Sequence, residues 1–429
     1  MLKLLRIAVR NLSRNRRRTL LAALAIMIGV GSMVVFRGFV NGMREMILSN
    51  LIDGQSGALQ IHRRGYQENL EGLPLTLDFE DSPSLRQRIQ AVPGVRALAP
   101  RITFGAMLST PDQPVEGNQP SEEEQGKTTY LVATAIDPAL EEAALPKRFH
   151  FLVQGHPPTS PDGPELLLND DLFQGLALPL MADPGTRPEV SRWPALLSAD
   201  RDGVLNGENV VVGGTLGSGL PGDRRVALVP LATAQRLLRM EGRVTAYAVA
   251  VDDLSRVSEV KARLEQTLGA DFEVHAWNDL LPFVEQLVDL QDFFMTLVGA
   301  IFLVVVLLGI LNALLMNVLE RIREIGTMMA VGVRRWQILT LMVMEGAALG
   351  VMGGLGGAAL GWAVCLGLSR RGVMMAAPGA VVEEVLRPYL TWGNLVAAAV
   401  ISILGASLAA LWPAWRASRL NPVDALRAP

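Results

Sequence analysis

Four long apolar stretches stand out from the pattern of hydrophobic and polar residues along the chain. They cover residues 19–40, 293–316, 336–368 and 392–415, and within the last three the one charged residue is Glu345. A transmembrane helix needs roughly 20 mostly apolar residues to cross the hydrocarbon core of a bilayer. The pattern therefore predicts four transmembrane helices over these ranges.

The 41–292 region has a different pattern, in which short strand-like and helix-like runs alternate. Strand-like runs flank a helical face twice, around residues 59–107 and again around 244–277. Two β-α-β units of this kind predict a ferredoxin-like subdomain that is split by an insertion of roughly 110–130 residues. Helical spacing of apolar residues just after the first span and just before the second predicts stalk helices. The predicted fold class is four transmembrane α-helices plus a large α+β domain outside the membrane.

Charge is distributed unevenly, although the formal net charge is only −3. Residues 1–19 carry seven basic and no acidic side chains, whereas 41–292 carry 21 basic and 36 acidic ones. Lys and Arg beside a span are retained in the cytoplasm. We therefore expect an uncleaved first span, with the large domain 41–292 and the short 369–391 loop outside. The segments expected inside are the amphipathic helix 1–18, the connection 317–335 and the tail 416–429.

Signals for catalysis and cofactor binding are weak. A single cysteine, Cys365, excludes a disulfide framework, and the four histidines are scattered without metal-ligand spacing. Residues 126–128 (Gly-Lys-Thr) resemble the end of a phosphate-binding loop, but Ser121 occupies the position where that loop needs Gly. The glycine-rich run 213–219 lacks a following amphipathic helix, so we interpret it as a turn. We expect no catalytic, cofactor-binding or metal-binding residue in this chain, and no nucleic-acid partner.

The connection between the second and third apolar stretches is the most specific part of the sequence. Across 317–335 apolar residues recur at helical spacing with charged residues between them, which alone predicts only an interfacial linker helix. Residues 320–327, however, read Glu-Arg-Ile-Arg-Glu-Ile-Gly-Thr, and Ala330, Gly332 and a pair of arginines follow. This segment resembles the cytoplasmic signature of FtsX-like permeases of ABC transporters. Residues 8–19 and 420–427 are similar to the terminal motifs of the same family.

The resemblance implies that 317–335 is a coupling helix that docks on a partner ABC ATPase dimer. ATP and Mg would then be bound by that partner, and this chain would be non-catalytic. A second permease copy or a paralogue, contact with membrane lipid, and a bacterial inner-membrane location with both termini cytoplasmic are implied as well. The residues expected to contact the ATPase are Glu320, Arg321, Arg323, Glu324, Gly326, Thr327 and Gly332.

The layout of four spans and one large outer domain resembles the MacB and LolC/LolE branch, whose outer domain has Porter-like and Sabre-like subdomains. Residues 38–43, 57–62 and 136–138 are more similar to the LolC/LolE lipoprotein-release permeases. That likeness implies mechanotransmission, in which ATP-driven motion extracts a lipoprotein for a periplasmic carrier. MacB-like efflux of peptides or hydrophobic toxins is the alternative. An FtsX-like scaffold that activates a cell-wall hydrolase is a third, against which the size of the outer domain counts.

The third apolar stretch contains one carboxylate and many glycines. A carboxylate at mid-bilayer costs ~2.5–3.5 kcal/mol on insertion scales, so Glu345 is expected to face protein or water. We favour a structural partner within the helix bundle over a proton relay. Small residues at four-residue spacing let helices pack closely. The glycines with this spacing are Gly346, Gly350 and Gly354, and Gly353, Gly357 and Gly361.

Overall fold

The computed structural model describes residues 16–111, 126–176, 178–181, 193–217, 225–280, 282–376 and 383–419. The predicted N-terminal helix lies almost entirely outside these residues, as does the C-terminal motif 420–427. The chain divides into two compact units. A helical unit comprises the chain up to Glu45, Gln286–Met374 and the chain from Val385, and an α/β unit comprises Met46–Glu285 and Met375–Glu384.

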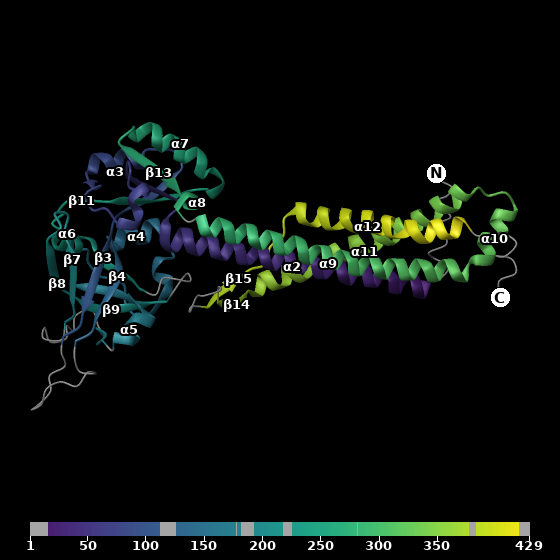
Figure 1. Cartoon of the computed structure of the whole chain (residues 1–429), viewed down its shortest axis with the longest axis horizontal. Helices are drawn as coiled ribbons and strands as arrows, with labels where there is room; N and C mark the ends of the chain where they lie inside the picture. The colour runs from purple at the N-terminus through teal and green to yellow at the C-terminus, as the bar shows by residue number, and fades with distance from the viewer. Residues whose placement is uncertain are drawn as a thin grey trace, which may run out of the picture. The chain divides into compact units, whose positions relative to one another are not determined.

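Four long helices and one short one make up the helical unit. They are α2 (Arg16–Leu51), α9 (Pro282–Glu320), α10 (Ile322–Ala330), α11 (Arg335–Arg371) and α12 (Trp392–Ser418). The long helices lie alongside one another, and α10 lies at the end where α9 stops and α11 begins (Figure 1). All four are long and apolar enough to cross a membrane, with windows of mean hydropathy between 1.8 and 2.9. The prediction of four candidate spans is confirmed.

Two rows of glycines on α11 allow it to approach both α12 and α2. A Cβ atom added to Gly350 would lie 2.7 Å from Ala406 Cβ of α12, and one added to Gly357 would lie 2.7 Å from the Met27 carbonyl oxygen of α2. Both distances are shorter than real carbon contacts, so only glycine fits at these points. The four-residue spacing therefore serves two separate helix contacts. The row toward α12 is Gly346, Gly350 and Gly354, and the row toward α2 is Gly353, Gly357 and Gly361.

The α/β unit contains the split ferredoxin-like subdomain that the sequence predicts. Its strands lie in the order β13-β1-β12-β3, with antiparallel pairing throughout. This is the order of the four-stranded β-α-β-β-α-β motif, and the insertion separates its second and third strands. The elements are β1 (Leu59–Arg63), α3 (Pro83–Gln90), β3 (Val95–Ser109), β12 (Ala246–Val251), α7 (Val257–Leu268) and β13 (Phe272–Ala276).

The insertion extends the same sheet through β4, β10, β6, β9 and β5, and β7 and β8 branch from β3. Strand β10 runs parallel to β4, and β9 runs parallel to β6. The ranges are β4 (Thr128–Ile136), α4 (Pro138–Ala144), η3 (Arg148–Phe151), β5 (Leu152–Gly155), β6 (Glu165–Asn169), α5 (Asp170–Leu176), β7 (Ala195–Ala199), β8 (Leu205–Asn209), β9 (Val211–Leu216), β10 (Val226–Pro230) and α6 (Leu231–Leu238).

Shorter elements complete the described chain. They are η1 (Ile52–Ser56), η2 (Gln67–Gly72), β2 (Phe79–Glu80), β11 (Arg243–Val244), η6 (Leu254–Arg256), α8 (Trp277–Leu280), β14 (Val373–Ala376) and β15 (Glu383–Leu386).

The glycine-rich run that the sequence analysis interpreted as a turn belongs partly to a strand. Gly213 and Gly214 lie inside β9, which pairs with β5. A Cβ atom on Gly214 would lie 2.8 Å from the Gln154 carbonyl oxygen of β5. The turn interpretation was therefore wrong for these two residues, because here glycine allows close approach of two strands and not a reversal of the chain.

The two faces of the sheet differ in character because side chains alternate along each strand. Ile61, Ile102 and Ala133 point to the face that α3 and α7 cover, and they belong to the main hydrophobic core. The next residues along, His62, Thr103 and Thr134, point to the opposite face. On that face α4 packs against a smaller apolar cluster that includes Ala99 and Ala248.

Candidate functional site

The segment 317–335 forms a compact turn around the short helix α10. Helix α9 ends at Glu320, and Arg321 breaks the helix with φ −108° and ψ 17° before α10 begins. After α10 the Gly332 N–H donates to the Met329 carbonyl and the Val333 N–H to the Met328 carbonyl. Gly332 has φ +97°, which only glycine adopts without strain. This is a Schellman ending, which terminates α10 sharply before α11 starts.

One side of α10 is anchored in a small apolar cluster. Ile325 is fully buried in it, and the neighbouring Gly326 is buried as well. Leu319, which shares the apolar repeat in the sequence, is exposed, whereas the preceding residue Val318 is buried in the cluster. The buried members of this cluster are Val318, Ile325, Ile338, Met342, Ala414 and Ala417. Helix α10 is thus packed against α11 and α12 rather than tethered only through its ends.

Three charged residues converge at the N-terminus of α10. The Arg321 guanidinium donates from Nε to Glu324 at 2.8 Å, and its Nη1 lies 3.4 Å from Glu345 Oε1. The Glu345 side chain is only 3% exposed, and Arg321 is 17% exposed. Glu345 lies ten positions beyond the start of α11 at Arg335, so this ion pair joins the α9–α10 break directly to α11.

The remaining predicted contact residues other than the buried Gly326 are exposed. Glu320, Arg323 and Thr327 are exposed, and Gly332 is exposed in the turn. The Thr327 hydroxyl donates to the Glu324 carbonyl at 2.8 Å. The structure therefore brings Arg321, Glu324 and Glu345 together, buries Gly326, and leaves Glu320, Arg323, Thr327 and Gly332 exposed. The sequence alone does not identify Arg321 as the partner of Glu345, although buried charges are generally paired.

A second feature of the helical unit, absent from the sequence predictions, is an apolar cavity between α2, α9 and α12. It has a volume of about 360 Å³ and is lined by residues such as Phe36, Met295 and Ala398. Its charged lining residue is Arg37, whose Nη1 lies 3.6 Å from Asp292 of α9. Arg44, about two helical turns further along α2, lies 3.6 Å from the other oxygen of the same carboxylate. No periodicity within one segment could reveal a cavity formed by three helices.

Of the weak phosphate-loop likeness, residues 121–125 lie outside the described part of the chain. Thr128 begins strand β4, whereas a phosphate-binding loop leads from a strand into a helix. Within the described part of the chain, no group of three His, Cys, Asp or Glu side chains has the arrangement of a metal site.

Two family models match the chain. Residues 19–267 match the MacB-like periplasmic core domain, and residues 296–422 match the FtsX-like permease C-terminal family. The macrolide export ATP-binding/permease protein MacB of Hyphomonas neptunium is 27% identical over 98% of this chain and 60% of its own length. The pyoverdine export ATP-binding/permease protein PvdT of Pseudomonas fluorescens is 27% identical over 96% of this chain and 57% of its own length.

Among solved structures, the periplasmic region of MacB from Actinobacillus actinomycetemcomitans covers 56% of this chain and 97% of its own, with 13% identity and a TM-score of 0.33. The chain spans about 60% of the length of the MacB relative from Hyphomonas neptunium. The first family model covers more than half of the chain, and the second covers most of the second candidate span, the last two spans and the α10 segment. The chain therefore belongs to the MacB/FtsX family of ABC transporter permeases.

Proposed function

We propose that this chain is the membrane subunit of a MacB-type exporter that works by mechanotransmission. An ABC ATPase dimer, lying outside these 429 residues, binds and hydrolyses ATP and moves the α10 segment. Two permease chains, either identical or paralogous, assemble with that dimer in the bacterial inner membrane. The observation that carries the proposal is the two-sided α10 segment: one side is locked into the helix bundle, and the other presents charged residues outward.

The packing of α10 supports its role as the point where force enters the bundle. Ile325 is buried against residues of α11 and α12, and Arg321 is paired with Glu345 of α11. A displacement of α10 would therefore displace α11 and α12 as well, because packed interiors transmit strain. The exposed Glu320 and Arg323 carry opposite charges, which suits docking in a groove that offers both signs.

Hydrophobic or amphipathic molecules, including peptides, are the cargo that we propose. The relatives with export in their names support this choice, and so does the apolar cavity between α2, α9 and α12. Release of lipoproteins to a periplasmic carrier is the second candidate. An acyl chain would suit the same apolar walls, and residues 38–43 and 57–62 favour this candidate by their likeness to lipoprotein-release permeases.

The test reverses two exposed charges of the α10 segment and leaves the buried Arg321–Glu345 ion pair unchanged. The double variant Glu320→Lys, Arg323→Glu should retain membrane insertion and the fold of the α/β unit but lose co-purification with the ABC ATPase. Breaking a desolvated charge pair at an interface typically costs about 2–5 kcal/mol of binding. The matched control is Arg370→Glu, Arg371→Glu, two exposed charges at the opposite end of α11. The control should bind the ATPase normally.

Two assays in the same strains identify the class of molecule that is transported. One measures resistance to macrolides and export of a peptide siderophore, and the other measures release of a lipoprotein from spheroplasts to its carrier. Loss of export only in the α10 double variant supports MacB-type efflux, whereas loss of lipoprotein release only in that variant supports the second candidate. Wild-type ATPase binding and wild-type transport in the double variant would leave α10 as a linker and refute the proposal.

A further inference from the structure

The apolar cavity between α2, α9 and α12 has a few polar residues among its apolar walls. It lies within the helical unit and encloses about 360 Å³. Phe36 of α2 and Ile401 of α12 line it and are 39% and 38% exposed, so the cavity is open to the surface of the bundle. Its described lining residues with polar side chains are Arg37, Thr296 and Asn394.

The three polar residues lie at the same end of the cavity. Arg37 is the last lining residue along α2, whereas Thr296 and Asn394 are among the first along α9 and α12. Helix α2 runs in the opposite direction to α9 and α12, so these positions coincide (Figure 1). This is the end at which α2 leaves the helical unit for the α/β unit. The cavity is therefore amphipathic along its length, with one polar end and apolar walls below it.

Exposed aromatic residues lie at the same level as this polar end. Tyr389 precedes α12 and Trp392 begins it, and they are 44% and 80% exposed. The Tyr389 N–H donates to the Gly38 carbonyl at 3.2 Å, and the Asn41 side-chain amide donates to the Tyr389 carbonyl at 3.3 Å. These bonds hold the aromatic residues beside Arg37. Because Trp and Tyr are enriched where the hydrocarbon core meets the headgroups, we expect the polar end at the level of the lipid phosphates.

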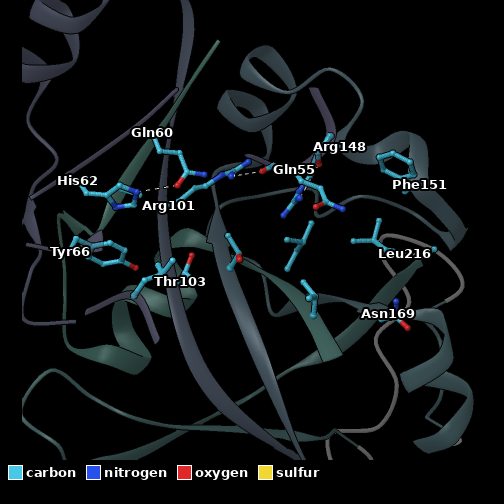
Figure 2. Close-up of a pocket in the computed structure, with 17 residues that line it drawn as sticks. Gln55, Gln60, His62, Tyr66, Arg101, Thr103, Arg148, Phe151, Asn169 and Leu216 are labelled. Atoms are coloured by element: carbon cyan, nitrogen blue, oxygen red, sulfur yellow. Dashed lines mark hydrogen bonds between the residues drawn. The ribbon is translucent and has the colours of Figure 1, made fainter. Parts of the chain in front are cut away.

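The Arg37 guanidinium has hydrogen-bond donors that the described residues do not use. It lies 3.6 Å from Asp292, which is an ion pair but too long for a hydrogen bond. Arg44 lies 3.6 Å from the other oxygen, so two guanidinium groups share this carboxylate. Arg101, which lines a cavity of the α/β unit, differs because it donates to the Gln55 carbonyl at 2.6 Å (Figure 2). Arg37 thus offers its N–H groups to an acceptor that comes from the membrane.

We infer that this cavity holds an acyl chain of a membrane phospholipid whose phosphate is bound by Arg37. A guanidinium group matches a phosphate with two parallel N–H···O bonds, and Arg37 is 38% exposed, so a headgroup can reach it. The side-chain amide of Asn394, which makes no hydrogen bond within the described residues, can donate to the same headgroup. The volume of the cavity suits one chain, so the second chain of the lipid stays in the bilayer. The inference concerns a bound lipid and holds whichever cargo the protein transports.

Native mass spectrometry of the full-length chain, delipidated in detergent, counts the bound lipids and measures their affinity. The probes are dioleoylphosphatidylglycerol and dioleoylphosphatidylethanolamine. Dioleoylglycerol is the matched control, because it has the same chains and no phosphate. At least one of the two phospholipids should bind at one molecule per chain. Dioleoylglycerol should bind about tenfold more weakly or less well still, because it lacks the charge-assisted hydrogen bonds of the phosphate.

Two variants with matched controls locate the site. Arg37→Gln should reduce the affinity for the phospholipid to that for dioleoylglycerol, whereas Arg371→Gln, at an exposed arginine outside the cavity, should bind as wild type. Gly299→Leu should fill the cavity and abolish binding. A Cβ atom added there meets only Met33 Cε, at 3.4 Å, which is an ordinary contact. Gly309→Leu, where an added Cβ atom meets nothing within 4 Å, should bind as wild type.

The inference is overturned if neither phospholipid binds, if dioleoylglycerol binds equally well, or if Arg37→Gln or Gly299→Leu binds as wild type. If Gly299→Leu does not fold, Arg37→Gln decides the question. If a second copy of the chain covers the cavity instead, Gly299→Leu will change the oligomeric mass and leave the number of bound lipids unaltered, which also overturns the inference. Transport is not measured in these assays, so the proposed function stands or fails separately.

Discussion

At the scale of single residues, the ion pair between Arg321 and Glu345 reconciles a carboxylate with a membrane-spanning helix. An unpaired carboxylate in a span costs several kcal/mol, and Glu345 is almost fully buried within α11. The break between α9 and α10 places the Arg321 guanidinium 3.4 Å from it. A second carboxylate, Glu324, holds the other side of the guanidinium at 2.8 Å. The ion pair thereby fixes the position of α10. It also fixes the depth in the membrane at which the Glu345 carboxylate of α11 lies.

Removing one partner of this pair should destabilise the helical unit strongly. In Arg321→Gln, Glu345 stays buried without its cation, which typically costs about 3–5 kcal/mol. The apparent melting temperature of the purified chain in detergent should fall, whereas Arg323→Gln, an exposed arginine two residues away, should leave it nearly unchanged. Replacing both partners in Arg321→Met, Glu345→Met should restore part of the loss. Equal melting temperatures for Arg321→Gln and Arg323→Gln would show that the pair contributes nothing.

The sequence predicts that Glu345 faces protein, but it does not predict the partner. Neither glycine nor proline marks the break at Arg321, and residues 317–330 have the periodicity of one continuous helix. A cavity in the α/β unit, on the sheet face opposite the main core, is a similar case. Alternation along β1 and β3 indicates that His62 and Arg101 share one face of a sheet, which for an isolated sheet would simply mean solvent. Only the covering segments η1 and η3 turn that face into a cavity, and η3 is distant in sequence from both strands.

At the scale of elements, α11 is the central helix of the bundle because it has two glycine rows. One row packs on α12 and the other on α2, and residues of α9, including Leu314, join the same hydrophobic cluster. Close approach gains dispersion contacts between helices, which drives association inside a bilayer where burial of apolar surface gives no advantage.

Two matched substitutions measure how much this helix packing contributes to stability. Gly350→Ala places a methyl group 2.7 Å from Ala406 Cβ and 3.0 Å from Ile403 Cα, so α12 must move away. Gly367→Ala, on the same helix, meets nothing within 4 Å. Alanine has a higher helix propensity than glycine by about 1 kcal/mol, so Gly367→Ala should be neutral or stabilising. Gly350→Ala should lower the apparent melting temperature in detergent despite that gain. A higher melting temperature in both variants would contradict the packing role of Gly350.

Local sequence patterns predict which helices and strands form better than they predict which of these elements pack or pair with one another. The glycine spacing indicates close helix contacts but not which helices make them, because the spacing lies on one helix and the contact needs two. The ferredoxin-like subdomain was predictable, since each β-α-β unit is a local pattern and the strand order of that motif is known. The order of the inserted strands was not, because β4 pairs with β10 about 90 residues away.

At the scale of the whole molecule, the uneven charge distribution predicts the orientation of the chain in the membrane. Basic residues gather before the first span and around α10, whereas the residues between the first two spans have a large excess of acid. Orientation follows the basic residues near span ends, since moving them across the membrane is unfavourable. With four spans, the N-terminus, the α10 segment and the C-terminus must share one side, and the residues of the α/β unit and the 369–391 loop must share the other.

Labelling of single cysteines with a membrane-impermeant maleimide tests this arrangement. In a Cys365→Ala background, Ser84→Cys in α3 and Arg371→Cys at the end of α11 are exposed and should react in spheroplasts. Val331→Cys lies next to α10, where the native side chain is 87% exposed, and should react only after lysis. Because all three sites are accessible in the folded chain, a difference between intact and lysed cells reports the membrane and not burial. Reaction of Val331→Cys in intact spheroplasts, with Ser84→Cys protected, would reverse the orientation and remove the α10 segment from reach of a cytoplasmic ATPase.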